Sequence, residues 1–240
     1  MVDRFSGFTY DGVHSSVKGV VLQREMVLSP PIPRIETITV PGRSGVLTRW
    51  DGSYEARTLS GDFYALSANV GADVQSVSRW LVGSLSPKRL ILDYDTQHYL
   101  LAAPTAGAQT ALRLGLLAPF SISFTCDPRR YLVWGDEEMD ISAQRAIYNP
   151  TGFPSQPLLF VDGAGMLTIT LGDSLSLLTV NVPEGGVWID TQSAQAYNGN
   201  GSMNALVEID GDPVINSGWQ QIDVRGDLRT LKIIPRWWEL

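Results

Sequence analysis

The run from Gly42 to Gly45, with Ser44 inside it, is the first part of the sequence that could carry chemistry. A serine hydrolase places its nucleophile in a Gly-x-Ser-x-Gly turn between a strand and a helix, with a histidine and an acid elsewhere. Here glycine follows the serine at once, Val46 takes the fifth position, and strand-like residues follow. A phosphate loop would need a Gly-Lys-Ser/Thr ending that opens a helix. Pro41 and the glycines instead favour a tight corner between two strands.

A pair of carboxylates, Asp93 and Asp95, is the second candidate for chemistry. Residues two apart on a strand point to the same side, where paired carboxylates could hydrolyse a glycosidic bond. Aspartates are also frequent at hairpin ends, where they bond their own backbone, and we expect that role here. A glycoside hydrolase that uses this pair remains an alternative hypothesis.

The residues that usually hold metals are scarce. Two histidines and the single Cys126 cannot build a closed zinc site without carboxylates, and one cysteine allows no internal disulfide framework. The segment 208–212 clusters carboxylates, but it lacks the spacing and terminal glutamate of an EF-hand loop. We therefore predict no catalytic residue, no metal site and no cofactor.

Aromatic residues of the second half could form a binding surface. Exposed aromatic rings can stack on sugars, although packing in a core or an interface is more common. The candidates are Trp188, Tyr197, Trp219, Trp237 and Trp238. If the last strand continued to its end, Trp237 would share the face of Leu231 and Ile233, while Trp238 would share the face of Arg236. We expect Trp237 in the core, and Trp238 and Arg236 on a candidate partner surface.

Composition and charge favour two globular β-rich parts. The 240 residues fit one large domain or two ordinary ones, and 23 Gly and 14 Pro favour many short strands. Residues 1–135 hold 13 Lys and Arg against 11 Asp and Glu, and residues 136–240 hold 5 against 14, so the net charges are +2 and −9. The acidic half is a poor candidate for nucleic-acid binding, because phosphate binding needs a surplus of Lys and Arg. No apolar run reaches the ~18 residues of a membrane span, and no secretion signal is evident. With a single cysteine in the chain, we expect folding in a reducing cytoplasm.

One helix and two hairpins are predicted in the first half. In "GADVQSVSRWLVGSLSP" the apolar residues recur at helical spacing, with Trp80 beside them, Asp73 as N-cap and Pro87 as the stop. The apolar positions are Val74, Val77, Leu81 and Leu85. Strand-like runs around "PGRSG" predict one hairpin, and residues 88–104 predict another that turns near 95–97.

Beyond an acidic and proline-rich boundary region, only short strands are predicted. "PLLFVDGAG" and "MLTITLGD" are typical of these strands, which Gly, Asp and Asn turns separate. The expected domains are residues 1–138 and 139–240, the second a β-sandwich or jelly roll.

Several landmarks in a fixed order resemble a known family. These landmarks are "FTYDG", "VPGRSGVL", "RLILDYDTQHYLLA", "FSISFTCDPRRYL", "IYNPTGFPSQPLLFVDGAG", "VWIDTQSAQAY" and "IIPRWWEL". Together with the change of texture near residue 140, they resemble the distal tail protein (Dit) family of long-tailed, flexible-tailed (siphovirus-type) bacteriophages over nearly the whole chain.

The resemblance implies a mainly β structure and a non-enzymatic role without cofactors. It implies a tail-tube-like β-sandwich with one α-helix, followed by a galectin-like β-sandwich. The protein would form a homo-hexameric ring at the distal end of the tail in the virion, after synthesis in the host cytoplasm. The ring would join the tail tube protein to tail-tip and baseplate proteins, with the tape measure protein as a further partner. DNA would only pass through the lumen, and no membrane would be bound. The alternative is a carbohydrate-binding module that contacts host surface glycans.

Overall fold

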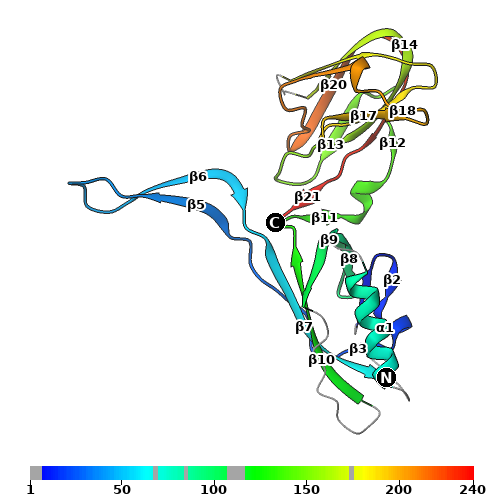
Figure 1. Ribbon diagram of the computed structural model, residues 1–240. Coiled ribbons are helices and arrows are strands. Elements are labelled where there is room, and N and C mark those ends of the chain that lie inside the picture. Colours follow the sequence, from blue (N-terminus) through cyan, green and yellow to red (C-terminus); the bar gives the residue numbers. More distant parts are fainter. Residues whose placement is uncertain (1–6, 67–69, 84–85, 107–116, 173–175) are drawn as a thin grey trace. The chain divides into compact units, whose positions relative to one another are not determined.

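The chain divides into two units, each with its own hydrophobic core. The computed structural model describes residues 7–66, 70–83, 86–106, 117–172 and 176–240. By contacts, unit 1 runs to Arg130 and unit 2 from Tyr131 to Glu239, whereas the expected boundary lay between residues 138 and 139. The predicted mainly β class is confirmed (Figure 1). Among the described residues α1 (Val70–Val82) is the single α-helix, and no helix there is long and apolar enough to cross a membrane.

Unit 1 is built on an antiparallel sheet. Its other elements are β1 (Phe8–Tyr10), β2 (Val13–His14), η1 (Ser15–Lys18), β3 (Val20–Leu22), β4 (Val27–Leu28), β5 (Pro33–Ile38), β6 (Leu47–Tyr54), β7 (Arg57–Leu66), β8 (Lys88–Leu92), β9 (Asp95–Ala106) and β10 (Leu117–Cys126). The strand order is β2–β1–β8–β9–β10–β7–β3, with β4 also paired to β7. The remaining two strands, β5 and β6, form a separate two-stranded sheet.

The core of unit 1 follows from strand periodicity. Phe120, Ile122 and Phe124 alternate along β10 and are buried on one side of the sheet. Phe8 and Phe63 join them, with their rings edge to face at 5.5 Å between centroids. Such pairs add about 0.5–1.5 kcal/mol beyond the burial of their area. The alternating apolar residues thus fix which face of the sheet carries the core.

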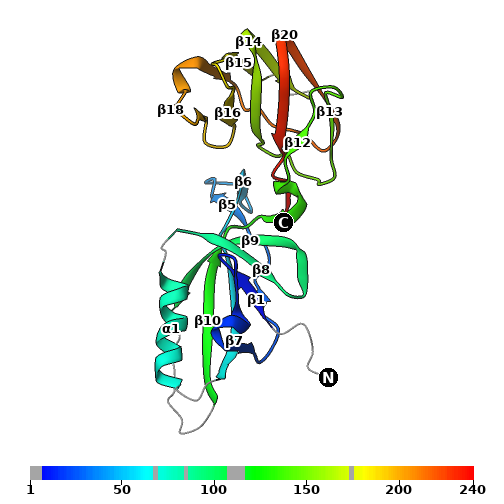
Figure 2. The ribbon, with the colours of Figure 1, turned by 90° about the vertical axis from the view of Figure 1, so that its right-hand side faces the viewer.

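The predicted helix is present as α1, and it lies along the sheet of unit 1 (Figure 2). Val77 and Leu81 are fully buried, as their spacing predicts. Trp80 is half-buried, and its ring stacks on Phe8 at 5.7 Å between centroids. The helical apolar stripe therefore packs on the aromatic core.

The start of the helix differs from the prediction. Asp73 lies inside α1, which begins at Val70, so its prediction as the N-cap is wrong. An aspartate is also favourable within the first turn, because the helix dipole attracts negative charge there, so residue type alone did not place the boundary. Leu85 lies outside the described residues.

The second predicted hairpin is β8–β9, but its turn is shifted. Leu92 and Asp95 are register partners, so Asp93 and Tyr94 form the turn, two residues before the expected one. Two-residue loops are the most common hairpin connections. Strand β9 therefore starts at Asp95, directly after this turn.

Unit 2 is a nine-stranded antiparallel arrangement with the path β12–β20–β14–β16–β17–β18. β13 pairs with β20, and β15 pairs with β14 and β19. The elements of this part of the chain are β11 (Arg130–Leu132), η2 (Val133–Asp136), β12 (Met139–Asp140), β13 (Ala146–Asn149), β14 (Leu158–Leu171), β15 (Leu177–Asn181), β16 (Val187–Asp190), β17 (Gln195–Asn198), β18 (Gly201–Ser202), η3 (Asn204–Leu206), β19 (Val207–Asp210), β20 (Gly218–Ile234) and β21 (Trp238–Glu239).

Two long strands, β14 and β20, hold unit 2 together (Figure 2). The first part of β14 pairs with β16 and the last part with β15, so the two halves of this strand have different neighbours. The register with β20 shifts between Asp162 and Gly163 and again between Ala164 and Thr168. Gly163 allows this bend, because a Cβ there would collide with the carbonyl oxygen of Asp227.

Candidate assembly surface

The hairpin β5–β6 is the most exposed element of the described chain. Every residue from 34 to 52 is exposed, and neither strand pairs with any other described strand (Figure 1). The predicted corner is confirmed: Ile38 pairs with Leu47, and Gly42 and Gly45 have φ of 80° and 84° in the loop between them. Glycine accepts this conformation without a side-chain clash.

Apolar cross-strand pairs lie on both faces of the hairpin. Ile35 pairs with Trp50, and Ile38 pairs with Leu47 three residues further toward the tip, so the two pairs point to opposite faces. Trp50 is 52% exposed. The described residues contain 17 exposed large hydrophobic side chains, and seven of them lie between residues 32 and 50. Solvent-facing apolar side chains gathered in this way mark an interaction surface.

The base of the hairpin is held in one conformation. The Trp50 indole donates a hydrogen bond to the carbonyl of Ser53 at 2.8 Å, and its ring meets Tyr54 edge to face at 5.5 Å. Asp51 accepts hydrogen bonds from the Ser53 hydroxyl and backbone N–H, at 2.6 and 2.8 Å. The hydroxyl contact is the main cause that lowers the pKa of Asp51. Gly52, with φ of 87°, permits the bend between them.

The hairpin pairs with no other described strand of its own chain. An isolated two-stranded hairpin is at best marginally stable in water. Its five charged side chains nearly balance, three basic and two acidic, so the hairpins of two copies would repel each other only weakly. These side chains are Arg34, Glu36, Arg43, Arg49 and Asp51. The arrangement suits docking on another protein surface.

The residues that the structure describes do not arrange a catalytic group around Ser44. Ser44 is exposed in the loop of the β5–β6 hairpin, before a strand and not a helix. His14 contacts both carboxylate oxygens of Asp93 at 3.1 Å, and His98 Nδ1 lies 2.7 Å from Asp95. Each histidine is engaged by its own carboxylate, so the structure does not bring either one to Ser44, and it separates Asp93 and Asp95 into two contacts.

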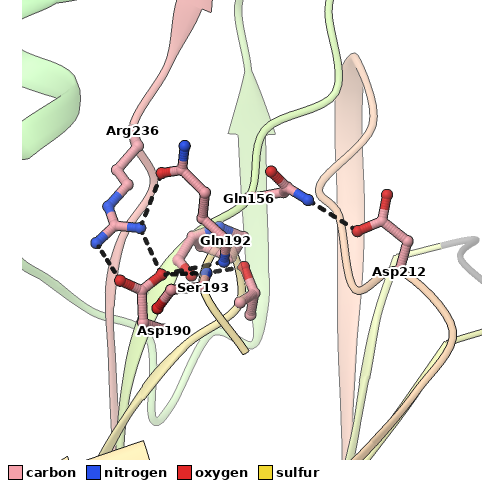
Figure 3. A network of polar contacts seen from close by, with 8 residues as sticks. Gln156, Asp190, Gln192, Ser193, Asp212 and Arg236 are labelled. Carbon is pink, nitrogen blue, oxygen red and sulfur yellow. Dashed lines mark hydrogen bonds and ion pairs between the residues drawn. The ribbon is translucent and has the colours of Figure 1, made fainter. Parts of the chain in front are cut away.

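The other residues considered for chemistry are also engaged or buried. Burial raises the pKa of Cys126 to about 12, so its thiol is a poor nucleophile at neutral pH. Within segment 208–212, Asp212 accepts a hydrogen bond from Gln156 at 2.9 Å (Figure 3). Among the described residues, no three His, Cys, Asp or Glu side chains gather as a metal site.

The structure places the aromatic end of the chain inside unit 2. Trp237 is fully buried, as predicted. Trp238 is 9% exposed, stacks on Phe153 at 4.5 Å between centroids, and donates its indole N–H to the carbonyl of Pro154 at 2.9 Å. The surface expected at Trp238 and Arg236 stays a prediction, and it would have to use the small exposed part of this indole.

Arg236 is held by a two-pronged ion pair with Asp190 (Figure 3). The two hydrogen bonds measure 2.7 and 3.1 Å, and a further contact to Gln192 measures 3.5 Å. Burial alone would raise the pKa of Asp190, but the Arg236 hydrogen bond and charge outweigh it and lower that pKa. The same partner raises the pKa of Arg236 against its own burial. The Arg236 guanidinium therefore already has a carboxylate partner within unit 2.

A second aromatic pair is open to solvent. Tyr148 on β13 and Trp219 on β20 are cross-strand neighbours with ring centroids 5.4 Å apart. Trp219 is 75% exposed. Sequence reasoning named Trp219 but missed Tyr148. The alternation of apolar Ile147 with its neighbours in "AIYN" could have indicated that Tyr148 faces outward.

Comparison with known proteins is informative at the level of the three-dimensional fold. No family model matches the sequence, and no curated protein matches it. Among solved structures, the chain is similar to the Dit (gp 19.1) protein of phage SPP1, described as a paradigm of the hub adsorption apparatus in phages that infect Gram-positive bacteria. The likeness has a TM-score of 0.74 at 15% identity and covers 98% of this chain and 99% of that one. The resemblance expected from the sequence is thus confirmed at the level of the fold: this chain is folded like a phage distal tail protein over almost its entire length.

Proposed function

We propose that the protein is a structural, non-enzymatic component of a phage tail tip that forms a homo-hexameric ring. The ring would join the tail tube protein to tail-tip proteins, contact the tape measure protein, and leave a lumen for DNA at the distal end of the tail. The fold shared with the SPP1 Dit protein supports a role in a phage tail. The exposed β5–β6 hairpin is the observation that carries the proposal of self-assembly.

The hairpin suits a contact in which the hairpin of one copy packs on a different surface of the next copy. A surface that fits a different surface of the same protein builds a closed ring when the rotation between copies closes. Burying Ile38, Leu47 and Trp50 in this way removes apolar area from water, which is the main driving force of association. Residues 131–135 hold no charge, so unit 1 has the same net charge of +2 as residues 1–135. Electrostatic repulsion between closely packed copies of unit 1 is therefore weak.

A lysine on the hairpin tests the proposal. Ile38→Lys should abolish the ring seen by negative-stain electron microscopy and weaken self-association about tenfold or more in sedimentation, because a charge would be buried among apolar groups. Val17→Lys is the matched control, since Val17 is exposed on η1 outside the hairpin. Rings that persist with Ile38→Lys, or that are lost equally with Val17→Lys, would contradict the role of the hairpin.

A second candidate function is glycan binding by unit 2. The exposed pair of Tyr148 and Trp219 favours it, because aromatic faces stack on sugar rings. The two rings, tilted by 50° to each other, would act as a platform at the paired strands β13 and β20.

A glycan screen separates the two functions. If the platform binds sugar, Trp219→Ala should reduce the affinity for host surface glycans by about tenfold, because the sugar would bury the Trp219 ring on binding. Met166→Ala, at another exposed apolar residue of unit 2, should change nothing. Equal retention of the same glycans by Trp219→Ala would rule out the platform and leave the ring proposal untouched.

A further inference from the structure

A cavity of about 220 Å³ opens in unit 1 where several strands begin or end. Arg57 is the first residue of β7 and Asp95 the first of β9, while Leu28 and Leu92 are the last residues of β4 and β8. These four residues, from four different strands, line the same cavity. Four leucines and two tyrosines supply most of the wall, and two arginines, one aspartate and one histidine supply the rest.

The single carboxylate of the cavity is already engaged. One oxygen of Asp95 lies 2.7 Å from His98 Nδ1, and the other accepts a hydrogen bond from Arg130 Nη1 at 3.3 Å. Asp95 therefore serves Arg130 and His98. It is not among the charged groups that shift the pKa of Arg57.

Arg57 is the group without a matching charge. Its side chain is only 7% exposed, and its Nε donates to the carbonyl of Ser29 at 2.7 Å. Its Nη1 is buried and has no hydrogen-bond partner among the described residues. Buried ionised groups in folded proteins are paired and hydrogen-bonded, so an unsatisfied guanidinium nitrogen in a cavity wall points to a ligand.

The surroundings of Arg57 oppose its positive charge. Burial lowers the pKa of Arg57, and the nearby positive charge of Arg130 lowers it further. Cys126 lies directly opposite Arg57 on β10, but its thiol has a pKa of about 12 and is uncharged at neutral pH. Neither neighbour supplies the counter-charge.

We propose that this cavity is a binding site for a carboxylate carried on an apolar stem, with the Arg57 guanidinium as the partner of the carboxylate. A guanidinium presents parallel N–H donors that match the two oxygens of a carboxylate. The guanidinium of Arg57 carries one positive charge without a counter-charge, and a monoanion would supply it. The leucine and tyrosine walls suit an apolar stem and would strip water from a doubly charged phosphate at greater cost.

Two sources could deliver this chemistry. One is an acidic side chain of a second copy of this chain, which would make the cavity part of an assembly contact. The other is a free small carboxylate. All lining residues belong to unit 1, so the site itself does not rest on the proposed ring.

Benzoate is the probe for the site, with neutral benzamide as its uncharged counterpart. Isothermal titration of the full-length Ile38→Lys variant should show benzoate binding, and benzamide should bind roughly tenfold more weakly or not at all. Adding Arg57→Gln should lower benzoate affinity by roughly tenfold or more, and Arg57→Lys should retain part of it, because the charge remains but the fork is lost. Arg24→Gln is the control, since Arg24 is an exposed arginine outside the cavity.

The comparison with the wild-type chain identifies the source. If a second copy fills the cavity, assembled wild-type protein should bind benzoate more weakly than Ile38→Lys, and benzoate should loosen the assembly. If the wild-type chain and Ile38→Lys bind benzoate equally well, a second copy does not fill the cavity, and a free carboxylate is its ligand. The same conclusion applies if the wild-type chain forms no ring. The proposal is overturned if Ile38→Lys binds no benzoate, if benzamide binds equally well, or if Arg57→Gln leaves benzoate affinity unchanged.

Discussion

At the level of single residues, most groups that could do chemistry are engaged inside their own unit. His14 contacts Asp93, His98 contacts Asp95, and Arg236 holds Asp190. Arg236 also has a φ of 55°, a conformation that side chains other than glycine seldom adopt. Its ion pair therefore holds a strained backbone position, and the chemistry of these residues serves the fold.

The pair of Asp190 and Arg236 makes the stability of unit 2 depend on pH. The pKa of Asp190 in the folded chain lies below its ordinary value of 3.8, so the unfolded chain binds the proton more tightly. The contribution of the pair is therefore complete above pH 3.8 and is lost as the pH falls through the lower, folded pKa. Asp190→Asn should cost about 2 kcal/mol at neutral pH and flatten the acid limb of a plot of Tm against pH.

The control for this prediction is the exposed pair of Glu138 and Lys232, with nitrogen and oxygen 2.8 Å apart. Glu138→Gln should change the Tm little at any pH, because water screens exposed ion pairs. An acid limb that stays as steep in Asp190→Asn as in the wild type would assign the pH dependence to other carboxylates.

At the level of elements, local patterns predicted the short-range structure well. The corner around Gly42 and the stripe of Val77 and Leu81 were correct, because glycine conformation and helical spacing act within a few residues. The long strand β14 was predicted as two strands, "PLLFVDGAG" and "MLTITLGD". Its glycines mark a bend within one strand, and only pairing with distant β20 distinguishes such a bend from a turn.

The aromatic end of the chain shows the same limit. The prediction for Trp238 assumed an unbroken strand, but β20 ends at Ile234, and Pro235 and the positive φ of Arg236 interrupt the alternation. After such a break, the face of a later residue no longer follows from its position in the sequence. The exposed pair of Tyr148 and Trp219 likewise depends on the register between β13 and β20.

The helix α1 can be tested at this level through Trp80. Trp80→Ala should destabilise unit 1 by roughly 3 kcal/mol, because its ring packs on Phe8 and Tyr10. Trp80→Phe should cost less, since it keeps an aromatic ring and removes the buried indole N–H, which has no hydrogen-bond partner among the described residues. Denaturant unfolding measures both. An alanine variant as stable as the wild type would show that α1 does not support the core.

At the level of the whole molecule, the two units differ in charge and in surface. Unit 1 has a net charge of +2 and carries the exposed hairpin, whereas unit 2 has −9. Copies of unit 2 repel one another at short range, and salt reduces that repulsion. We therefore predict that, in the proposed ring, unit 1 alone makes the contacts between copies.

Two fragments test this division of labour. A fragment of residues 1–130 should still form a closed ring, and a fragment of residues 131–240 should be a folded monomer. The cut belongs at residue 130 and not at 138, because Gly135 packs against the backbone of Trp237 and accepts a hydrogen bond from Arg236 N–H at 2.8 Å. Analytical ultracentrifugation sizes both. A monomeric first fragment or a ring-forming second one would place the assembly contact in the wrong unit.

The chain enters and leaves unit 2 at nearly the same place. The backbone N–H of Leu132 donates to the carbonyl of Trp237 at 2.9 Å, so the first and last segments of the unit lie side by side. Two fluorescent dyes attached near residues 131 and 239 would exchange energy efficiently while unit 2 is folded. They would separate when it unfolds, whatever happens to unit 1. Energy transfer between the two dyes would therefore report whether unit 2 is folded, even in an assembled particle.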